Sequence, residues 1–257
     1  MGILNVTDDS FYDGGRFVKD ASIYKQAEKL LAEGADIIDI GGYSSRPHAT
    51  DIPEAIETQR VLKGLNIVKS LDPNLPVSID TFRSTIASVA VEHGADIIND
   101  ISGGNMDAKM FETIAQLGVP YIMMHMIGTP QTMTSHTDYK DMVMEMLDYF
   151  SKKTMLLTQF GVKDVIIDVG FGFSKTIGQN FNLLASLKNF RMLHSPLMVG
   201  ISRKSMIYKT LETSAENALN GTTALNTVAL LNSAQLLRVH DVKEAKQVIK
   251  LLKMLPH

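Results

Sequence analysis

Residues 32–42 read AEGADIIDIGG, and residues 91–104 repeat the same pattern as VEHGADIINDISGG. In both stretches the end of a helical pattern is followed by a glycine turn, a short apolar run and a glycine-rich exit. Any protein that alternates strands with helices can use this pattern, so two copies do not fix the architecture. They indicate that the chain is built from strand–helix units.

Short apolar runs of this kind occur eight times along the chain. Each ends at or beside a polar or charged residue, and these residues are Asn5, Asp39, Asp80, Asn99, His125, Asp168, Arg203 and His240. Helical patterning separates the runs, at roughly residues 21–33, 53–70, 83–93, 107–117, 139–160, 179–192 and 215–233, and it resumes at residue 242. We therefore predict an α/β protein, a single (β/α)8 TIM barrel domain over residues 1–257, with its active site at the C-terminal ends of the strands.

The last helical pattern supports a barrel. Its apolar stripe consists of Val242, Ala245, Ile249 and Leu252, and lysines occupy the opposite side, as expected for a helix packed on the outside. Asp241 and Glu244 predict a capping box at its start. The alternative architecture is an open doubly wound sheet, but the GxGxxG fingerprint of its dinucleotide-binding members is missing.

The composition allows a barrel and argues against several other classes. A chain of 257 residues with 45% hydrophobic content can bury a large core, and no linker divides it. The net charge of −3 provides no positive field for nucleic acid or an acidic membrane. The absence of cysteine removes disulfides and thiolate chemistry. We expect a cytoplasmic protein without a leader or membrane span, whose partners are small molecules and not nucleic acid or membrane.

Three segments that follow apolar runs are suited to anions and cations. Residues 5–15, NVTDDSFYDGG, crowd together oxygen-bearing side chains that suit a hard cation such as Mg2+. Residues 41–49, GGYSSRPHA, place Arg46 and two hydroxyls in a glycine-bounded loop, where a guanidinium can bind phosphate through two parallel hydrogen bonds. Residues 200–205, GISRKS, bring Arg203, Lys204 and Ser205 to a strand end that leads into a helix N-terminus. Taken singly, each segment is more typical of a solvated turn.

Hydrogen-bond acceptors follow three other runs. Asp80, Asn99 and Asp168 have apolar neighbours, so each needs a partner in place of water. A single buried aspartate often has a purely structural role. Three such residues on separate strands, however, would converge on one mouth together with Lys204 and Arg238. This set suits a flat, nitrogen-rich heterocycle whose N–H groups need acceptors.

These segments together resemble those of the dihydropteroate synthases. The shared motifs keep their order along nearly the whole chain: MGILNVTDDSFYDGG (1–15), GGYSSRPHA (41–49), SIDT (78–81), ADIINDISGG (95–104), MMHMIGTPQTM (123–133), DVGFGFSKT (168–176), SRKSMI (202–207) and RVHDV (238–242). The resemblance implies a transferase of folate biosynthesis that joins p-aminobenzoate to 6-hydroxymethyl-7,8-dihydropterin diphosphate, giving 7,8-dihydropteroate and diphosphate. It also implies a Mg2+ cofactor, a homodimer and a target of sulfonamides.

The same resemblance assigns roles to individual positions. The pterin would be held by Asp80, Asn99, Ile101, Met124, Asp168, Lys204 and Arg238. The diphosphate would be held by Asn5, Ser45, Arg46, Arg238 and His240, with Asn5 and Asp13 at the Mg2+ site. p-Aminobenzoate would contact Phe11, Pro47, Phe173 and Ser205. The catalytic residues would be Asp13, Arg46, Asp80 and Lys204.

The implied chemistry needs no side-chain nucleophile. When the pterin C–O bond breaks first, positive charge develops on the pterin and negative charge on the diphosphate. Asp80 would stabilise the first charge, and Mg2+ with Arg46 the second. The neutral amine of p-aminobenzoate then attacks the pterin methylene carbon.

Four departures from the family motifs bear on the loops and the pterin segment. These are Asp8 in place of proline, Tyr43 in place of glutamate, His48 in place of glycine and Val169 in place of proline. None of them carries an assigned role. Met1 falls almost inside the first strand, so we expect either a truncated chain or one domain of a longer polypeptide, such as a fusion to a pterin pyrophosphokinase domain.

Two rival functions stay open. A pterin-binding methyltransferase that passes a methyl group from a folate to a corrinoid would share the barrel and the acceptors, but it has no use for the Ser45–Pro47 motif. A non-catalytic paralogue that binds pterins would explain the altered loops. Retention of Asp13, Arg46 and Lys204 argues against that paralogue.

Overall fold

A computed structural model of the chain describes residues 1–7, 16–44 and 51–255, with side chains described from residue 21 onward in the first helix. The strands are β1 (Gly2–Asn5), β2 (Ile38–Gly41), β3 (Val77–Asp80), β4 (Ile97–Asp100), β5 (Tyr121–Met124), β6 (Val165–Asp168), β7 (Leu197–Val199) and β8 (Leu236–Leu237). The helices are α1 (Arg16–Ala32), α2 (Glu54–Leu71), α3 (Ser84–Glu92), α4 (Met110–Leu117), α5 (Met142–Phe160), α6 (Ile177–Ala185), α7 (Ser205–Tyr208), α8 (Leu219–Leu231) and α9 (Val242–Leu252). Two 3-10 helices, η2 (Met133–Ser135) and η3 (Leu187–Leu193), complete the described elements.

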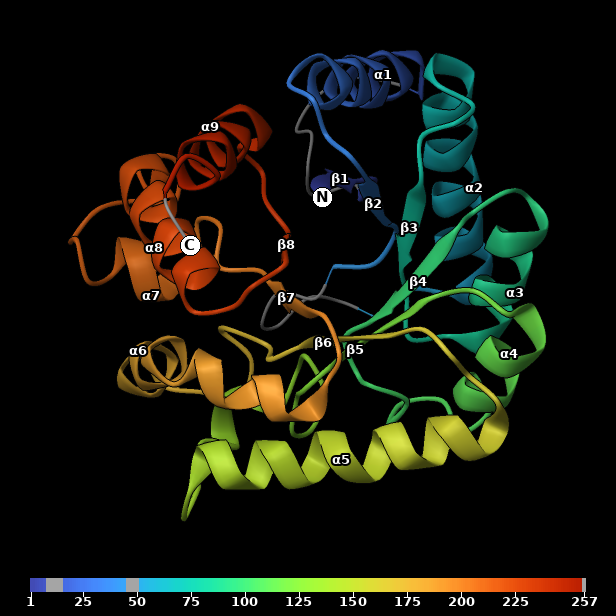
Figure 1. The fold of residues 1–257 in the computed structure, drawn as a ribbon. Helices are drawn as coiled ribbons and strands as arrows, with labels where there is room; N and C mark the ends of the chain where they lie inside the picture. Colours follow the sequence, from blue (N-terminus) through green and yellow to red (C-terminus); the bar gives the residue numbers. More distant parts are fainter. Residues whose placement is uncertain (8–15, 45–50, 256–257) are drawn as a thin grey trace.

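The eight strands form one parallel sheet in the order β1 to β8. A parallel bridge between Gly2 and Val239 joins the two edges, and Ile3 N donates to Val239 O at 3.0 Å. The sheet is therefore closed into a barrel, and the helices surround it in Figure 1. This closure confirms the predicted (β/α)8 architecture. None of the helices in the described ranges has both the length and the apolar character needed to cross a membrane.

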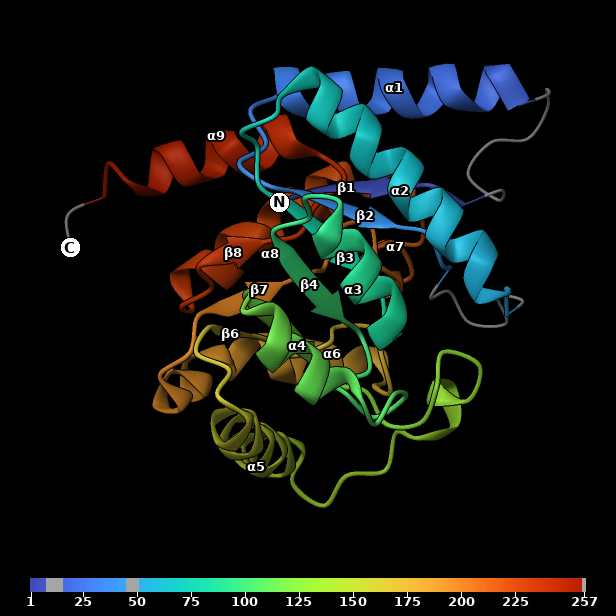
Figure 2. The same cartoon turned by 90° about the vertical axis from the view of Figure 1, so that its right-hand side faces the viewer.

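The strand register brings polar residues to one level of the barrel. Asn5 pairs with Gly41, and Gly41 pairs with Asp80. Asp80 pairs in turn with Asn99. Because side chains alternate between the two faces of a strand, register-paired residues point to the same face. Asn5, Gly41 and Asp80, which end their strands, and Asn99, one residue before the end of β4, therefore meet at one end of the barrel, on the side toward which the β4 arrow points in Figure 2.

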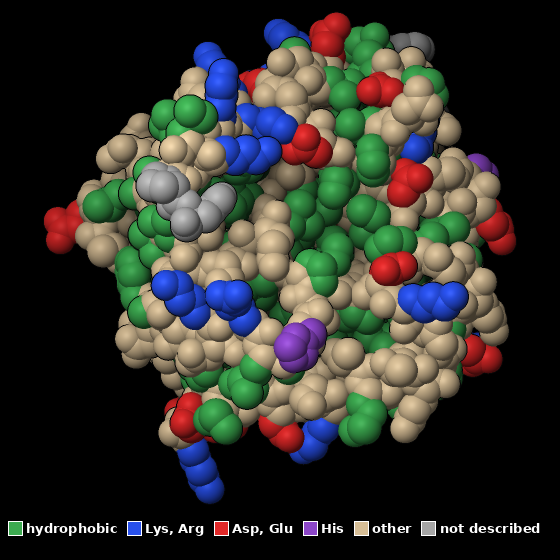
Figure 3. All heavy atoms as spheres, viewed as in Figure 1, with side chains coloured by type: hydrophobic (Ala, Val, Ile, Leu, Met, Phe, Trp, Pro, Cys, Tyr) green, Lys and Arg blue, Asp and Glu red, His purple; other side chains and the backbone are tan. Residues whose placement is uncertain are grey.

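Apolar side chains fill the rest of the structure. The larger core lies between the sheet and the helices and includes the fully buried Leu30, Leu65, Phe150 and Phe190. A smaller cluster occupies the barrel interior toward the N-terminal ends of the strands, and it consists of Met1, Ile97, Ile122 and Met198. On the face shown in Figure 3, hydrophobic side chains gather toward the centre while most charged side chains lie around them. The interior is thus a packed core, and the polar residues lie above it at the C-terminal mouth.

The predicted helices are present, with local differences. The first begins at Arg16 instead of residue 21. The predicted helix at 179–192 divides into α6 and η3 because Ser186 leaves α-helical geometry, with φ −95° and ψ 6°.

The capping box predicted at the start of α9 was wrong. The Asp241 side chain accepts no hydrogen bond from the helix; its carboxylate instead accepts from Arg203 Nε and Nη2 at 2.9 and 2.8 Å. A charge-assisted pair with a guanidinium is stronger than a bond to a backbone amide, so Arg203 takes the carboxylate. A capping box is present at α6, between Thr176 and Gln179.

Candidate active site

Arg238 directly follows β8 and lies at the centre of a charged network in the barrel mouth. Its Nε donates to Asp39 Oδ2 at 2.6 Å, and its Nη2 donates to Asp80 Oδ2 at 2.8 Å. Asn99 Nδ2 donates to the same Asp39 oxygen at 3.2 Å. Burial opposes the charge of Arg238, but Asp39 and Asp80 outweigh it and raise the pKa of the guanidinium. One cation thus links β2 and β3, and Asn99 of β4 joins the network through Asp39.

Asp80 ends β3, and its side chain shares the space above Gly41 with Asn5. A Cβ atom at Gly41 would lie 3.4 Å from Asn5 Oδ1 and 3.8 Å from Asp80 Oδ2, so glycine leaves room for both side chains. Burial raises the pKa of Asp80 to about 7, although the neighbouring Arg238 favours the anion. A carboxylate in this position is poised to gain or lose its charge when a ligand changes its surroundings.

Asp168 and Lys204 form a second pair of opposite charge. Asp168, the last residue of β6, accepts a hydrogen bond on Oδ1 from Gly170 N at 2.8 Å. Lys204, in the loop after β7, donates from Nζ to Phe171 O, and the same Nζ lies 4.7 Å from the centroid of the Phe173 ring. Burial raises the pKa of Asp168 and lowers that of Lys204 to about 8, and the charge of each partner opposes the other's shift.

An apolar wall borders these charged residues. We use this name for the cluster of Tyr43, Phe82, Ile101, Met124, Met126, Met133 and Phe173. The rings of Tyr43 and Phe82 meet edge to face at 5.0 Å, and Gln131 Nε2 donates to the Tyr43 hydroxyl at 3.0 Å. The structure therefore brings Ile101, Met124 and Phe173 into one cluster beside the polar groups, an arrangement suited to planar ligands.

His240, which follows β8, and Ser205, which follows the loop after β7, lie at the same end of the barrel. The backbone N–H of His240 donates to Ser202 Oγ at 3.2 Å. Burial lowers the pKa of the His240 imidazole to about 4, and the charge of Arg238 adds to this effect. The imidazole is therefore neutral at pH 7 and can donate one hydrogen bond. Ser205 is the first residue of α7.

Five predicted site residues lie outside the described residues, namely Phe11, Asp13, Ser45, Arg46 and Pro47. The departures Asp8 and His48 lie there too, so the roles given to these positions stay predictions. Within residues 1–7, 16–44 and 51–255, no three His, Cys, Asp or Glu side chains gather so as to hold a metal ion. Asn5 is the predicted Mg2+ ligand whose place is described, at the mouth.

The anion site expected at residues 203–205 is only partly present. Arg203 adopts a left-handed backbone conformation (φ 54°) and turns to Asp241 and to the carbonyl oxygens of Ala215 and Glu216. Its guanidinium is committed to these partners and holds loops together. Lys204 is the cation that this segment contributes to the mouth.

The sequence-based prediction missed Asp39 as a member of the network. Asp39 is fully buried and holds both Arg238 and Asn99. The sequence did contain a signal for this role, because an aspartate inside the apolar run IIDI cannot remain charged without a partner. His125 and Lys175 were missed as a pair: Lys175 Nζ lies 3.3 Å from His125 Nδ1 behind the apolar wall.

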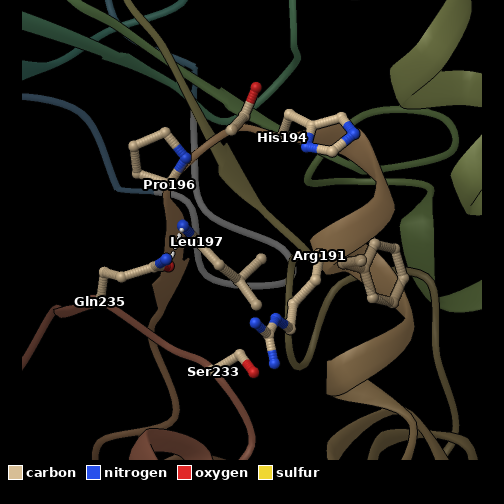
Figure 4. Close-up of a pocket in the computed structure, with 8 residues that line it drawn as sticks. Arg191, His194, Pro196, Leu197, Ser233 and Gln235 are labelled. Atoms are coloured by element: carbon tan, nitrogen blue, oxygen red, sulfur yellow. Dashed lines mark hydrogen bonds between the residues drawn. The ribbon is translucent and has the colours of Figure 1, made fainter.

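A separate pocket lies at the other end of the barrel. It has a volume of about 270 Å3 and is lined by Phe190, Arg191, His194, Ser195, Pro196, Leu197, Ser233 and Gln235. Figure 4 shows Arg191 extending toward Ser233 beside the start of β7. Because Leu197 begins its strand whereas the mouth residues end theirs, this pocket is distinct from the candidate site.

Comparison with known proteins agrees with this geometry. Residues 1–240 match the family model described as pterin binding enzyme. The chain belongs to this family of pterin-binding enzymes. Within the family its relatives are dihydropteroate synthases: the enzyme of a Synechocystis species is 41% identical over 253 residues, which cover 97% of this chain and 87% of the relative.

Two solved structures are similar over nearly their whole length. The Yersinia pestis dihydropteroate synthase, in a sulfonamide drug complex, has a TM-score of 0.91 and 33% identity, covering 98% of this chain and 92% of that one. The Xanthomonas albilineans dihydropteroate synthase, with 4-aminobenzoic acid, has a TM-score of 0.91 and 34% identity, covering 99% of this chain and 93% of that one.

Proposed function

We propose that this chain condenses 6-hydroxymethyl-7,8-dihydropterin diphosphate with p-aminobenzoate to give 7,8-dihydropteroate and diphosphate. The observation that carries the proposal is the network in the mouth, where acceptors from separate strands meet the cations Lys204 and Arg238. Membership in the family and the names of the relatives support the identity of the substrates.

The pterin would bind by its polar edges. Its amino and ring N–H groups need acceptors, which the Asp168 carboxylate and the Asn99 amide oxygen supply, while Lys204 donates to a ring acceptor. The planar guanidinium of Arg238 would stack on one face of the ring. Ile101 and Met124, from the apolar wall, would complete the pocket.

Asp80 would act on the charge that develops as the C–O bond breaks. Positive charge spreads over the methylene carbon and the pterin ring, and a buried carboxylate beside the ring stabilises it far more strongly than water would. For this role the Asp80 carboxylate must first be released from Arg238. Arg238 would then stay bound to Asp39. The neutral amine of p-aminobenzoate attacks the methylene carbon and afterwards loses a proton.

The diphosphate would be held next to Asp80, at the ends of β1 and β8. Asn5 and the neutral imidazole of His240 are the described groups there, and Ser45 and Arg46 are assigned by the family resemblance. The amide oxygen of Asn5 suits Mg2+, with Asp13 as the second predicted ligand. Mg2+ bound in this way would neutralise charge on the departing diphosphate.

p-Aminobenzoate would bind against Phe173 and Ser205, with Phe11 and Pro47 assigned by resemblance. Phe173 belongs to the apolar wall, so the aromatic ring gains a packed surface, while the Ser205 hydroxyl meets the carboxylate. Sulfonamides carry a similar ring and would compete for this place. A homodimer, a cytoplasmic location and a fusion to a pterin pyrophosphokinase domain stay predictions.

The test is diphosphate release from the pterin substrate with and without p-aminobenzoate. We expect release with Mg2+ that depends on p-aminobenzoate. Methyl transfer from a folate to a corrinoid, without diphosphate release, would show the methyltransferase instead. Pterin binding with neither reaction would show a non-catalytic paralogue.

A further inference from the structure

Lys175 is a buried lysine whose described partners are all uncharged. Its Nζ donates to Gly170 O at 3.0 Å and to Phe173 O at 2.9 Å, and it lies 3.3 Å from His125 Nδ1. Asp168 acts on this ammonium through its charge but forms no direct ion pair with it. Burying a cation in this way is costly, and a shorter apolar side chain would avoid the cost. The burial of this ammonium therefore indicates a role beyond packing.

His125 completes the site that receives the ammonium. Burial lowers the pKa of His125 to about 3, with the charge of Lys175 adding to the shift, so the imidazole is neutral. Since an ammonium group can only donate, His125 Nδ1 accepts. The His125 ring is itself fixed by Tyr149, edge to face at 4.9 Å.

The two carbonyl groups that Lys175 holds belong to residues at both substrate subsites. Gly170 donates its N–H to Asp168 Oδ1 and so orients the carboxylate assigned to the pterin. Phe173 is the part of the apolar wall assigned to p-aminobenzoate. Lys175 thus spans the segment that separates the two subsites.

The backbone of residues 170–173 is also restricted by tight packing against its neighbours. Gly170 has φ +69°, and a Cβ atom there would lie 2.2 Å from His125 O, so the chain passes directly over the end of β5. Gly172 has φ +81°, its N–H donates to Asn180 Oδ1 at 2.7 Å, and a Cβ atom there would lie 3.2 Å from Lys204 Cδ. These glycines therefore serve tight packing of the loop rather than leaving open room for a ligand.

We propose that Lys175 is a positioning residue for the condensation, whose ammonium fixes the spacing between the pterin carboxylate of Asp168 and the p-aminobenzoate wall at Phe173. The inference rests on the proposed function, because it uses the two subsites assigned there. Burial lowers the pKa of Lys175 to about 7, and the charge of Asp168 opposes this shift.

The test compares Lys175→Met with a matched variant. Methionine is an unbranched side chain one atom shorter than lysine, and it removes the donors. Lys69→Met is the control, since Lys69 Nζ also binds a loop carbonyl, Leu75 O at 3.1 Å, but at the N-terminal end of the barrel. We expect the KM for p-aminobenzoate to rise at least tenfold in Lys175→Met, with a smaller change in pterin diphosphate affinity, and to stay unchanged in Lys69→Met.

A double-variant cycle separates positioning from general stability. In a Phe173→Ala background, Lys175→Met should change the KM for p-aminobenzoate less than twofold, because the wall residue it positions is gone. An equal rise in both backgrounds, or no rise in either, would overturn the proposal. If Lys175→Met does not fold, Lys175→Gln, which keeps a donor, replaces it in the same cycle. Failure of both to fold while Lys69→Met folds would assign the ammonium to the fold alone and would also overturn it.

Assays of the wild-type chain distinguish a failure of this proposal from a failure of the proposed function. Wild-type protein that releases no diphosphate would contradict the proposed function itself. A wild-type chain that turns over, with a folded Lys175→Met variant of equal KM, would contradict only the role of Lys175.

Discussion

Asp39 and Asp80 lie on neighbouring strands and hold one guanidinium between them, Arg238 Nε on the first and Nη2 on the second. The two carboxylates differ in setting: Asp39 is fully buried and also accepts from Asn99, whereas Asp80 ends its strand at the mouth. This division would leave Arg238 anchored by Asp39 if Asp80 turned to a bound ligand.

The Asp80→Asn variant should lose turnover rather than binding. The charge that Asp80 stabilises is small in the bound substrate and large once the C–O bond has stretched, so the loss falls on kcat. We expect pterin diphosphate to bind within about tenfold of wild type, and the chemical step to slow on the order of a hundredfold or more. Dissociation constants and single-turnover rates measure both. The control is Asp36→Asn, which changes an exposed aspartate that pairs with Lys246. If Asp80→Asn lost binding but kept the chemical step intact, Asp80 would be a recognition group.

The pH dependence of the same step follows from the pKa of Asp80, which burial raises to about 7. The carboxylate is the active form, so kcat/KM for pterin diphosphate should fall as the pH drops below about 7 and level off above it. The fall in kcat/KM at low pH is the acid limb of the pH profile. In Asp80→Asn the part of this limb that comes from protonation of Asp80 should be absent. An identical acid limb in both proteins would assign it to ionisation of the substrate diphosphate.

Asp168→Asn should weaken pterin binding. The substitution replaces an acceptor oxygen by an amide donor that would face the ligand's own N–H groups and leave a buried group unpaired. We expect a loss of about 2–4 kcal/mol in pterin affinity, from a mismatched hydrogen bond and lost charge assistance. Calorimetry on the folded variant measures it, and nearly unchanged affinity would mean that another carboxylate binds the pterin.

His125→Gln should make the fold less sensitive to acid. The pKa of His125 is about 3 in the folded chain against an ordinary 6.5, so the unfolded chain binds more protons between these values. The contribution of His125 to the free energy of unfolding is fully present above about pH 6.5 and decreases as the pH drops toward 3. At pH 5 about 2 kcal/mol of it is lost. Denaturant unfolding at pH 7 and pH 5 should show a smaller drop for His125→Gln. The exposed His93→Gln is the control, and equal drops in both variants would contradict the assignment.

p-Aminobenzoate should bind after the pterin substrate. Its expected walls include the loops that carry Phe11 and Pro47, which also meet the diphosphate, so we predict measurable binding only when pterin and diphosphate with Mg2+ are present. Calorimetric titration of the empty protein checks the order. Tight binding of p-aminobenzoate without pterin would contradict it.

The barrel and much of its mouth follow from the sequence because the signals are local. Asp80, Asn99 and Asp168 each close a short apolar run, and in parallel strands such ends converge without further information. The partners of Arg203 and Arg238 were not predictable in this way. Asp241 and Asp39 are 38 and 199 residues from the arginines they bind, and only the closed sheet shows which carboxylate each guanidinium meets.

The most direct measurement of the central claim is product formation from isotopically labelled p-aminobenzoate and pterin diphosphate, followed by mass spectrometry with diphosphate counted in parallel. We expect labelled 7,8-dihydropteroate and diphosphate in a one-to-one ratio, with Mg2+ present, and formation of both that is slower by on the order of a hundredfold or more in Asp80→Asn. Diphosphate release without incorporation of the label, or no turnover by a folded wild-type chain, would contradict it.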